Sequence, residues 1–226
     1  MRHCIIKPAT KNKGTERCKS MKTEMKHKAD DDDMFFHQVD NDTYMTKLLA
    51  RQTSPRFEIV SFEQFKNDWL NAFEGLWNED NENDMNDIKY IYNCLTFPRR
   101  STKHSAGYDF KSPINFKLKP GESIMIPTGI RSYMPSDMVL MIFPRSGLGT
   151  KYQLHPANLT CVIDSDYFYA DNEGHILIKM VNDGDKTVTI NQGQAFVQGI
   201  FTQYFTTYDD NADGVRTGGM GSTDKK

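Results

Sequence analysis

The clearest helical spacing of apolar residues lies shortly after residue 60. The apolar positions there are Phe62, Phe65, Trp69, Leu70, Phe73 and Trp77. Side chains three and four positions apart fall on one helix face, so the spacing predicts an amphipathic helix. Ser61, with Gln64 three residues later, forms a capping box at its start. The aromatic stripe is more typical of core packing than of a ligand pocket.

The segments that flank this helix carry weaker patterns. Phe57–Val60 reads as a short strand before the helix. The acidic stretch Asn78–Asp87 after it reads as a solvated loop, and Ile88–Leu95 as a further strand.

From residue 98 onward, short apolar runs alternate with turn residues. The expected strands are Ser123–Ile126, Met138–Phe143, His175–Val181, Thr187–Ile190 and Ala195–Phe205. Gly, Pro, Asn and Asp lie between these runs, and no helical period separates them. This order favours a mainly β fold, a barrel or jelly roll, over parallel βαβ units.

The two ends of the chain differ from its middle. Residues 1–54 are Lys-rich, then acidic at Asp30–Asp33, with few apolar residues and no period. Such a segment is expected to be a disordered tail, with a targeting signal or an interaction arm as alternatives. Asp209–Lys226 is polar and Gly-rich, typical of a flexible arm. The expected divisions are therefore 1–54, a strand–helix extension over 55–97, a β-barrel over 98–208, and an arm over 209–226.

Composition narrows the classes of partner. The 226 residues hold 28 Lys+Arg and 30 Asp+Glu, a net charge of -2, which argues against a nucleic-acid-binding polycation. No apolar run approaches the roughly 18–20 residues of a membrane span. The four cysteines are scattered without a C-x-x-C pair, which argues against a disulfide framework or a zinc site and favours a reducing, cytoplasmic compartment.

Two segments could bind phosphate. Arg145, Ser146 and Gly147 follow an apolar strand, and they combine a planar fork of donors, a hydroxyl and an accessible backbone N–H. The run from Arg216 to Thr223 could wrap a polyanion with its backbone and hydroxyls. An ordinary surface arginine and a disordered tail remain the alternatives for these two segments.

An acidic segment could activate water. If Ile163–Tyr167 is extended, Asp164 and Asp166 lie on the same side of it. One carboxylate could then deprotonate a water molecule while hydrogen bonds hold the other. An Asx-type turn is the alternative.

Together these fragments resemble the trimeric dUTPase family, in its Gram-positive and phage form. Five family motifs appear in order: Ala106–Phe110, Pro144–Gly149, Asn158–Tyr167, Gly193–Gln198 and Arg216–Thr223. The resemblance covers about the last 130 residues. It implies a distorted antiparallel jelly-roll barrel, in agreement with the strand pattern, in the cytoplasm of a bacterial or phage-infected cell.

The resemblance implies that dUTP is hydrolysed to dUMP and pyrophosphate by water attack on the α-phosphorus. Asp164 matches the general base, and Tyr167 the aromatic residue that excludes a 2′-hydroxyl by a clash. Asn158 matches the uracil contact, and Ile163 is also expected at the substrate.

The phosphate roles follow the same matches. Arg145, Ser146 and Gly147 would hold the triphosphate, and Gln198 would lie near the α-phosphate and the water. The arm would close over the substrate through Arg216, Gly219, Met220, Gly221, Ser222 and Thr223. Asp109 would support the site and a metal-bound water. Mg²⁺ would be carried by phosphates and waters, with no protein ligand.

Several positions depart from the family pattern. Met220 stands where an aromatic residue usually covers uracil, and Cys161 replaces a glycine beside the uracil loop. Gln194 replaces an acid, and Phe168–Glu173 resembles an insertion. The resemblance further implies a homotrimer. An alternative function is a nucleotide-gated regulatory protein that binds a partner through Phe168–Glu173. A dCTP deaminase would share the fold, but the motifs favour dUTPase.

Overall fold

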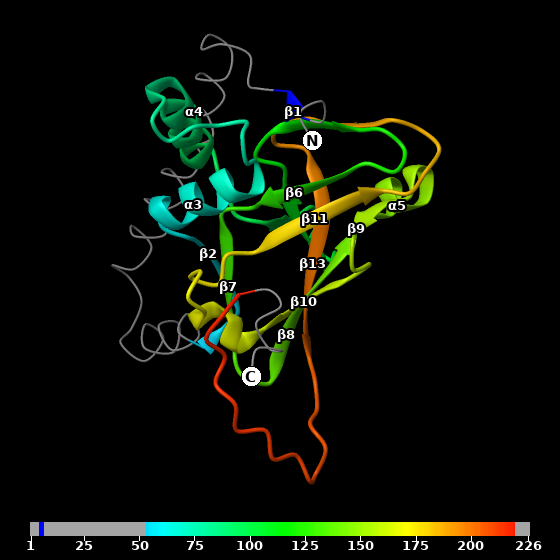
Figure 1. The fold of residues 1–226 in the computed structure, drawn as a ribbon. Coiled ribbons are helices and arrows are strands. Elements are labelled where there is room, and N and C mark those ends of the chain that lie inside the picture. The colour runs from blue at the N-terminus through cyan, green and yellow to red at the C-terminus, as the bar shows by residue number, and fades with distance from the viewer. Residues whose placement is uncertain (1–4, 7–52, 220–226) are drawn as a thin grey trace, which may run out of the picture. The chain divides into compact units, whose positions relative to one another are not determined.

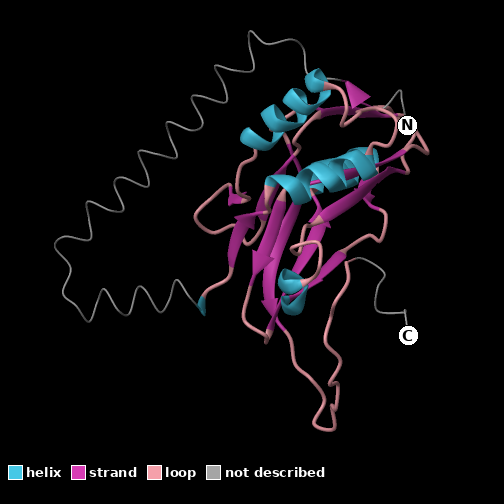
Figure 2. Ribbon diagram, turned by 60° about the vertical axis from the view of Figure 1, so that its left-hand side comes forward, coloured by secondary structure: helices cyan, strands magenta, loops and turns pink. Residues whose placement is uncertain are grey.

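The computed structural model describes residues 5–6 and 53–219, whose regular secondary structure is mainly antiparallel strands (Figures 1 and 2). The strands are β1 (Ile5–Ile6), β2 (Arg56–Ile59), β3 (Arg99–Arg100), β4 (Tyr108–Lys111), β5 (Asn115–Leu118), β6 (Ser123–Pro127), β7 (Ile130–Tyr133), β8 (Met138–Pro144), β9 (Leu154–Pro156), β10 (Cys161–Asp164), β11 (Leu177–Asn182), β12 (Val188–Ile190) and β13 (Ala195–Gln203). They are accompanied by α3 (Phe62–Ala72), α4 (Glu82–Asn93), α5 (Ser146–Tyr152) and the 3₁₀ helix η2 (Ser165–Tyr169).

Within the described ranges the strands form four sheets. Their orders are β1-β5-β12, β10-β8-β13-β4-β3, β6-β11-β9 and β2-β7. Every pairing between these strands is antiparallel. The expected jelly-roll class is therefore confirmed, and each of the five strands expected after residue 98 is present with boundaries shifted by a few residues.

The five-stranded sheet positions most of the residues that the motifs singled out. Its central strand β13 pairs with β4 on one side and β8 on the other, so Gln198 lies opposite both Asp109 and Phe143. On its far side β8 pairs with β10, which places Asp164 opposite Val139. Strands β8 and β13 thus form a common frame for four of the five motifs.

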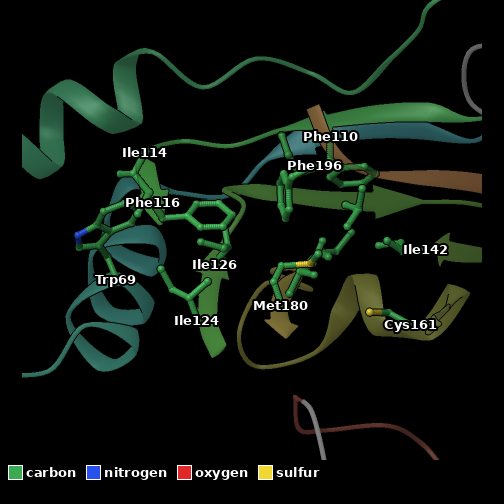
Figure 3. Packing of buried hydrophobic residues seen from close by; sticks show 14 of the residues in the cluster. Trp69, Phe110, Ile114, Phe116, Ile124, Ile126, Ile142, Cys161, Met180 and Phe196 are labelled. Atoms are coloured by element: carbon green, nitrogen blue, oxygen red, sulfur yellow. The ribbon is translucent and has the colours of Figure 1, made fainter. Parts of the chain in front are cut away.

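One hydrophobic core joins the extension to the barrel. Phe65 and Trp69 of α3 are fully buried, in the same cluster as Phe116 and Phe196 of the barrel. Figure 3 shows Trp69 beside Ile114 and Phe116. Each large aromatic side chain removes extensive apolar area from water, so this stripe stabilises the attachment of α3. Core packing, as expected, accounts for the stripe.

The start of α3 follows the expected pattern with one change. Ser61 is the N-cap, and its hydroxyl accepts a hydrogen bond from the Gln64 backbone N–H at 3.1 Å. The Gln64 side chain does not return to Ser61, because it donates to Asp68 at 2.8 Å. Glu173, far along the chain, accepts from the Ser61 N–H instead, at 2.7 Å. The second half of the capping box is therefore supplied by tertiary structure.

The strand expected at Ile88–Leu95 is wrong, because these residues lie mostly in α4. Asn81 caps this helix by accepting from the N–H groups of Asn83 and Asp84, so part of the expected acidic loop is helical as well. Ile88 and Ile91, three positions apart, are buried on one helix face. In so short an apolar run this helical spacing competes with a strand pattern, and the cap decides for the helix.

Strand β1 pairs with β5, with Ile5 opposite Phe116. It falls within residues 1–54, for which the sequence predicted no regular structure. The remainder of the predicted tail up to residue 52 lies outside the described residues, as does the end of the predicted arm from residue 220.

Candidate functional site

One group of predicted site residues gathers where β8 ends. Asp109 lies on β4 and Gln198 on β13, and Arg145 directly follows β8. The Arg145 Nε lies 3.0 Å from Asp109 Oδ1. The Gln198 side-chain amide donates to the Pro144 carbonyl at 3.2 Å. We call Asp109, Arg145 and Gln198 the Arg145 group.

Asp109 is held from both sides. One carboxylate oxygen pairs with Arg145, and the other accepts a hydrogen bond from the Ser101 hydroxyl at 2.6 Å. With both oxygens engaged, Asp109 fits a role in orienting Arg145 and nearby water. Ser101 was not identified from the sequence, because a serine eight positions from an aspartate carries no recognisable signal.

The phosphate-directed segment opens a short helix. Arg145 is the N-cap residue of α5, and its side chain also approaches the Ala195 carbonyl at 3.5 Å. Ser146 and Gly147 are exposed, and no atom lies within 4 Å of a Cβ built on Gly147. Both residues are thus open to solvent, where an anion could approach them.

A second group forms at the opposite end of β8. It consists of Asp164, Asp166, Tyr167 and Arg216, which we call the Asp164 group. Arg216 Nη2 donates to Asp164, and Arg216 Nε donates to Asp166 at 2.9 Å. The guanidinium carbon also lies 5.7 Å from the centre of the Tyr167 ring. One arginine from the arm thus joins all three residues.

The backbone of the acidic segment differs from the expected extended form. Asp164 ends β10, but Ser165–Tyr169 forms η2. Asp164 makes no side-chain cap hydrogen bond to this helix, so an Asx-type turn does not describe it. The two carboxylates are brought together by the strand–helix junction and by Arg216.

Tyr167 is nearly enclosed, with 4% of its surface exposed. Its hydroxyl donates to the His175 carbonyl and accepts from the Asn172 side-chain amide, each at 2.8 Å. Burial raises the pKa of Tyr167, so the hydroxyl stays protonated at neutral pH. Neither Asn172 nor His175 was identified from the sequence, because their contact with Tyr167 depends on the fold of the insertion.

The expected uracil loop lies between β9 and β10. The buried Cys161 thiol donates to the Asn158 side-chain oxygen, with 3.3 Å between sulfur and oxygen. Burial raises the pKa of the Cys161 thiol, and the Asn158 contact only partly offsets this rise. The side chain of Ile163 is half-buried against the core. Cys161 thus orients the carboxamide of the predicted uracil contact.

The two groups do not meet within one chain. Asp164 lies opposite Val139, whereas Arg145 follows the other end of β8. Val139 and Arg145 are six positions apart along this extended strand, about 20 Å at the usual rise per residue. The family resemblance implies a site built from several subunits, and within one chain the fold holds these residues in two separate groups.

The arm returns to the Asp164 group. The chain leaves β13, forms a long loop and comes back beside η2 (Figure 1). There the Asp171 N–H donates to the Thr217 carbonyl at 3.0 Å. A Cβ on Gly219 would lie 3.3 Å from Asn172 Nδ2, so the arm backbone lies against the insertion. Met220, Gly221, Ser222 and Thr223 lie outside the described residues.

The described part of the chain shows neither a cluster of metal-ligating side chains nor a membrane-spanning helix. No group of three or more His, Cys, Asp or Glu side chains is arranged to hold a metal ion there. Among the same residues, no helix has both the length and the apolar character needed to cross a membrane.

Comparison with known proteins adds the family context. Residues 94–223 match the family model for dUTPase. The deoxyuridine 5'-triphosphate nucleotidohydrolase of Lactococcus lactis is 41% identical over 138 residues, which span 60% of this chain and 92% of that protein. Its counterpart in Hahella chejuensis is 34% identical over 148 residues, 61% of this chain and 93% of that protein. The crystal structure of dUTPase from Streptococcus mutans is 39% identical, with a TM-score of 0.45 over 49% of this chain and 87% of that one.

Proposed function

The chain belongs to the dUTPase family, and from this premise we propose how its residues hydrolyse dUTP to dUMP and pyrophosphate. The observation that carries the proposal is the position of Asp164. Asp164 is the last residue of β10, the strand that follows the Asn158 loop. Its carboxylate binds Arg216, which also lies near the Tyr167 ring. The predicted uracil contact Asn158, the proton acceptor Asp164 and the sugar-facing ring of Tyr167 therefore follow one another along one segment.

In the proposed reaction, Asp164 accepts a proton from a water molecule whose oxygen attacks the α-phosphorus. The bond from the α-phosphorus to the bridging oxygen breaks, and pyrophosphate leaves with that oxygen and its electron pair. The side chain of Asp164 is about half exposed, so solvent reaches it. Gln198 orients the α-phosphate and the water, and it can do so because the Pro144 carbonyl fixes its amide.

Arg145, Ser146 and Gly147 bind the triphosphate in this proposal, and Arg216 joins them when the arm closes. Arg216 now pairs with Asp164 and Asp166. Phosphate oxygens offer the guanidinium a stronger bidentate partner, so substrate draws Arg216 away and frees the base. By this move, the Arg216 guanidinium couples phosphate binding to the release of Asp164 as a general base.

Mg²⁺ is proposed as the cofactor, held mainly by the substrate phosphates and water. When bound, it neutralises phosphate charge, which favours attack and departure of pyrophosphate. The described side chains fit this arrangement, because both Asp109 oxygens are engaged by Arg145 and Ser101. Asp109 would therefore support the site and a metal-bound water rather than serve as a direct ligand.

A homotrimer is proposed because one chain cannot complete the site. The Arg145 group and the Asp164 group lie about 20 Å apart along β8. The linker to the arm also exposes large apolar side chains, with Phe205 at 96%, Tyr208 at 103% and Val215 at 87%. Contact with another chain would remove these apolar side chains from water, which is favourable. Neighbouring copies supply the missing group to each site.

The remaining proposals concern location and a second role. The scattered cysteines favour the cytoplasm, where nucleotides and reducing conditions coincide. A regulatory role through Phe168–Glu173 is favoured by one observation, the 72% exposure of Tyr169. Phe168 is buried and Glu173 is bonded to Ser61, so Tyr169 would carry such a contact.

The proposed activity is tested by pyrophosphate release from dUTP, UTP and dCTP with Mg²⁺. Wild type is expected to cleave dUTP alone, and Asp164→Asn to lose nearly all activity while still binding dUTP. Asp183→Asn is the control, because this exposed carboxylate pairs with His155 outside both groups. Intact dUTP after incubation with wild type, or a fully active Asp164→Asn, would contradict the mechanism.

A further inference from the structure

The hydroxyl of Tyr167 is the end point of a buried hydrogen-bond chain that begins in helix α3. The hydroxyl donates to the His175 carbonyl, and Asn172 Nδ2 donates to the hydroxyl, both at 2.8 Å. Asn172 Nδ2 also lies 3.4 Å from the same carbonyl. Since the ring is 4% exposed, these bonds fix both its depth and its rotation.

His175 is itself held on both ring nitrogens. Its Nε2 lies 2.8 Å from the Gly129 backbone N–H, and its Nδ1 lies 2.6 Å from Asp68 Oδ2. A backbone N–H can only donate, so Nε2 accepts and carries no proton. The proton is then on Nδ1, which donates to Asp68. The imidazole, with no exposed surface, is therefore held as one neutral tautomer.

Asp68 belongs to α3, outside the barrel. The same oxygen accepts from the Gln64 side chain at 2.8 Å. A second attachment lies nearby, where the Ser61 hydroxyl donates to Glu173 at 2.6 Å. The extension thus holds the insertion at two positions, and the insertion holds Tyr167.

The backbone between these attachments has little freedom. Gly174 has a φ of +69°, a left-handed conformation that favours glycine. A Cβ there would lie 2.6 Å from the Tyr167 carbonyl oxygen, so the chain passes directly over η2. The Asn172 side-chain oxygen accepts from the Gly174 N–H at 3.2 Å, which orients the amide toward Tyr167. Displacement of His175 would therefore be transmitted to Tyr167.

We propose that Asn172, His175 and Asp68 are positioning residues for Tyr167, so that the N-terminal extension sets the selectivity of the site for a 2′-deoxy sugar. The inference rests on the proposed function, in which the Tyr167 ring excludes a 2′-hydroxyl. The Tyr167 ring can exclude a 2′-hydroxyl only if it cannot move away from the sugar. The chain from α3 keeps the ring in place.

The test compares kcat and KM for dUTP and UTP in wild type, Asn172→Ala, Asp68→Ala and Asp68→Asn. Asn172→Ala and Asp68→Ala are each expected to lower the preference for dUTP about 5- to 10-fold, the equivalent of one hydrogen bond. The change should appear mainly as a lower KM for UTP. Asp68→Asn should keep most of the wild-type preference for dUTP that Asp68→Ala loses, because its amide oxygen still accepts from His175 Nδ1.

Asn81→Ala is the matched control for stability. It removes the N-cap of α4 in the same extension and touches neither Asp68 nor the insertion. Asn81→Ala is expected to lower the free energy of unfolding by about 1 kcal/mol. It should leave the preference for dUTP over UTP unchanged. Asn172 bonds to the Tyr167 hydroxyl directly, whereas Asp68 acts through His175, so either variant alone carries the test if the other fails to fold.

A double variant separates positioning from general loosening. Tyr167→Phe keeps the ring and removes the bonded hydroxyl, so adding Asn172→Ala should cost no further selectivity. If the variants lose stability as Asn81→Ala does but keep the wild-type preference, the network is only structural and the inference is wrong. If wild type leaves dUTP intact, the proposed function itself fails. Active wild type with unchanged variants overturns the inference alone.

Discussion

Gly107 shows how a single residue can control the Arg145 group without touching substrate. A Cβ at this position would lie 2.5 Å from Gln198 Oε1 and 3.3 Å from Gln198 Cβ. The obstruction is the end of a flexible side chain, so an added methyl group would displace Gln198 rather than the backbone. The Gln198 amide would then lose its bond to the Pro144 carbonyl.

Gly107→Ala is therefore expected to lower kcat for dUTP about 10- to 100-fold, because a misplaced orienting group is costly to catalysis. Its melting temperature should stay within a few degrees of wild type. Gly214→Ala serves as control, because no atom lies within 4 Å of its added Cβ. Equal kcat in the two variants would remove Gln198 from the proposed mechanism.

At the scale of elements, α3 and the insertion stabilise each other through Glu173 and Ser61. The carboxylate accepts from both the N–H and the hydroxyl of Ser61 at the start of the helix. Burial alone would raise the pKa of Glu173. The two Ser61 bonds, with the positive charge of Arg131 nearby, outweigh burial and hold it below the ordinary 4.5. A carboxylate at a helix N-terminus is also favoured by the helix dipole.

Glu173→Gln is expected to lower stability by about 1 kcal/mol at neutral pH, a modest effect because the site is partly solvated. A lowered pKa means that the folded protein favours the ionised form. The stabilisation is thus complete above pH 4.5 and lost as the pH falls through the lower folded value. Urea unfolding measured from pH 7 to pH 3 should show the free energies of unfolding of wild type and Glu173→Gln becoming equal as the pH falls. If the difference in the free energy of unfolding stayed constant across that pH range, the charge of Glu173 would not be its cause.

At the scale of the whole molecule, the separation of the two groups along β8 determines how activity can be lost and regained. A chain with a defective Arg145 group still carries an intact Asp164 group, and the reverse also holds. If each site combines groups from different copies, two inactive variants can complete each other. A site built within one chain would not allow this.

Arg145→Ala and Asp164→Asn are each expected to be inactive alone. After joint refolding at equal concentration, mixed assemblies should regain about a quarter of wild-type activity, since that share of sites combines two intact groups. Light scattering should give three times the 26.0 kDa chain mass. The control is a double variant of one chain refolded with either single variant, which should stay inactive. A monomeric mass, or no recovery in the mixture, would contradict the shared site.

Features that depend on residues close together in the sequence were the easiest to predict. The Ser61 cap and the aromatic stripe of α3 were recognisable because they depend on residues three and four positions apart. The sequence predicts a strand at Ile88–Leu95, where the structure has the second half of α4. The apolar run there is short, and the cap at Asn81 lies in a stretch of loop-forming residues. The division of the chain at residues 54, 97 and 208 remains a prediction.

By itself the sequence determined the β class, the family and the residues expected at the site, because turn residues, apolar spacing and motifs are local properties of the chain. Only the tertiary structure decided that Arg145 and Asp164 lie at opposite ends of β8, and that Asp68 supports Tyr167 through His175. Asp68 and His175 are 107 residues apart. Contacts of that kind arise from strand register and core packing, which depend on the whole chain at once.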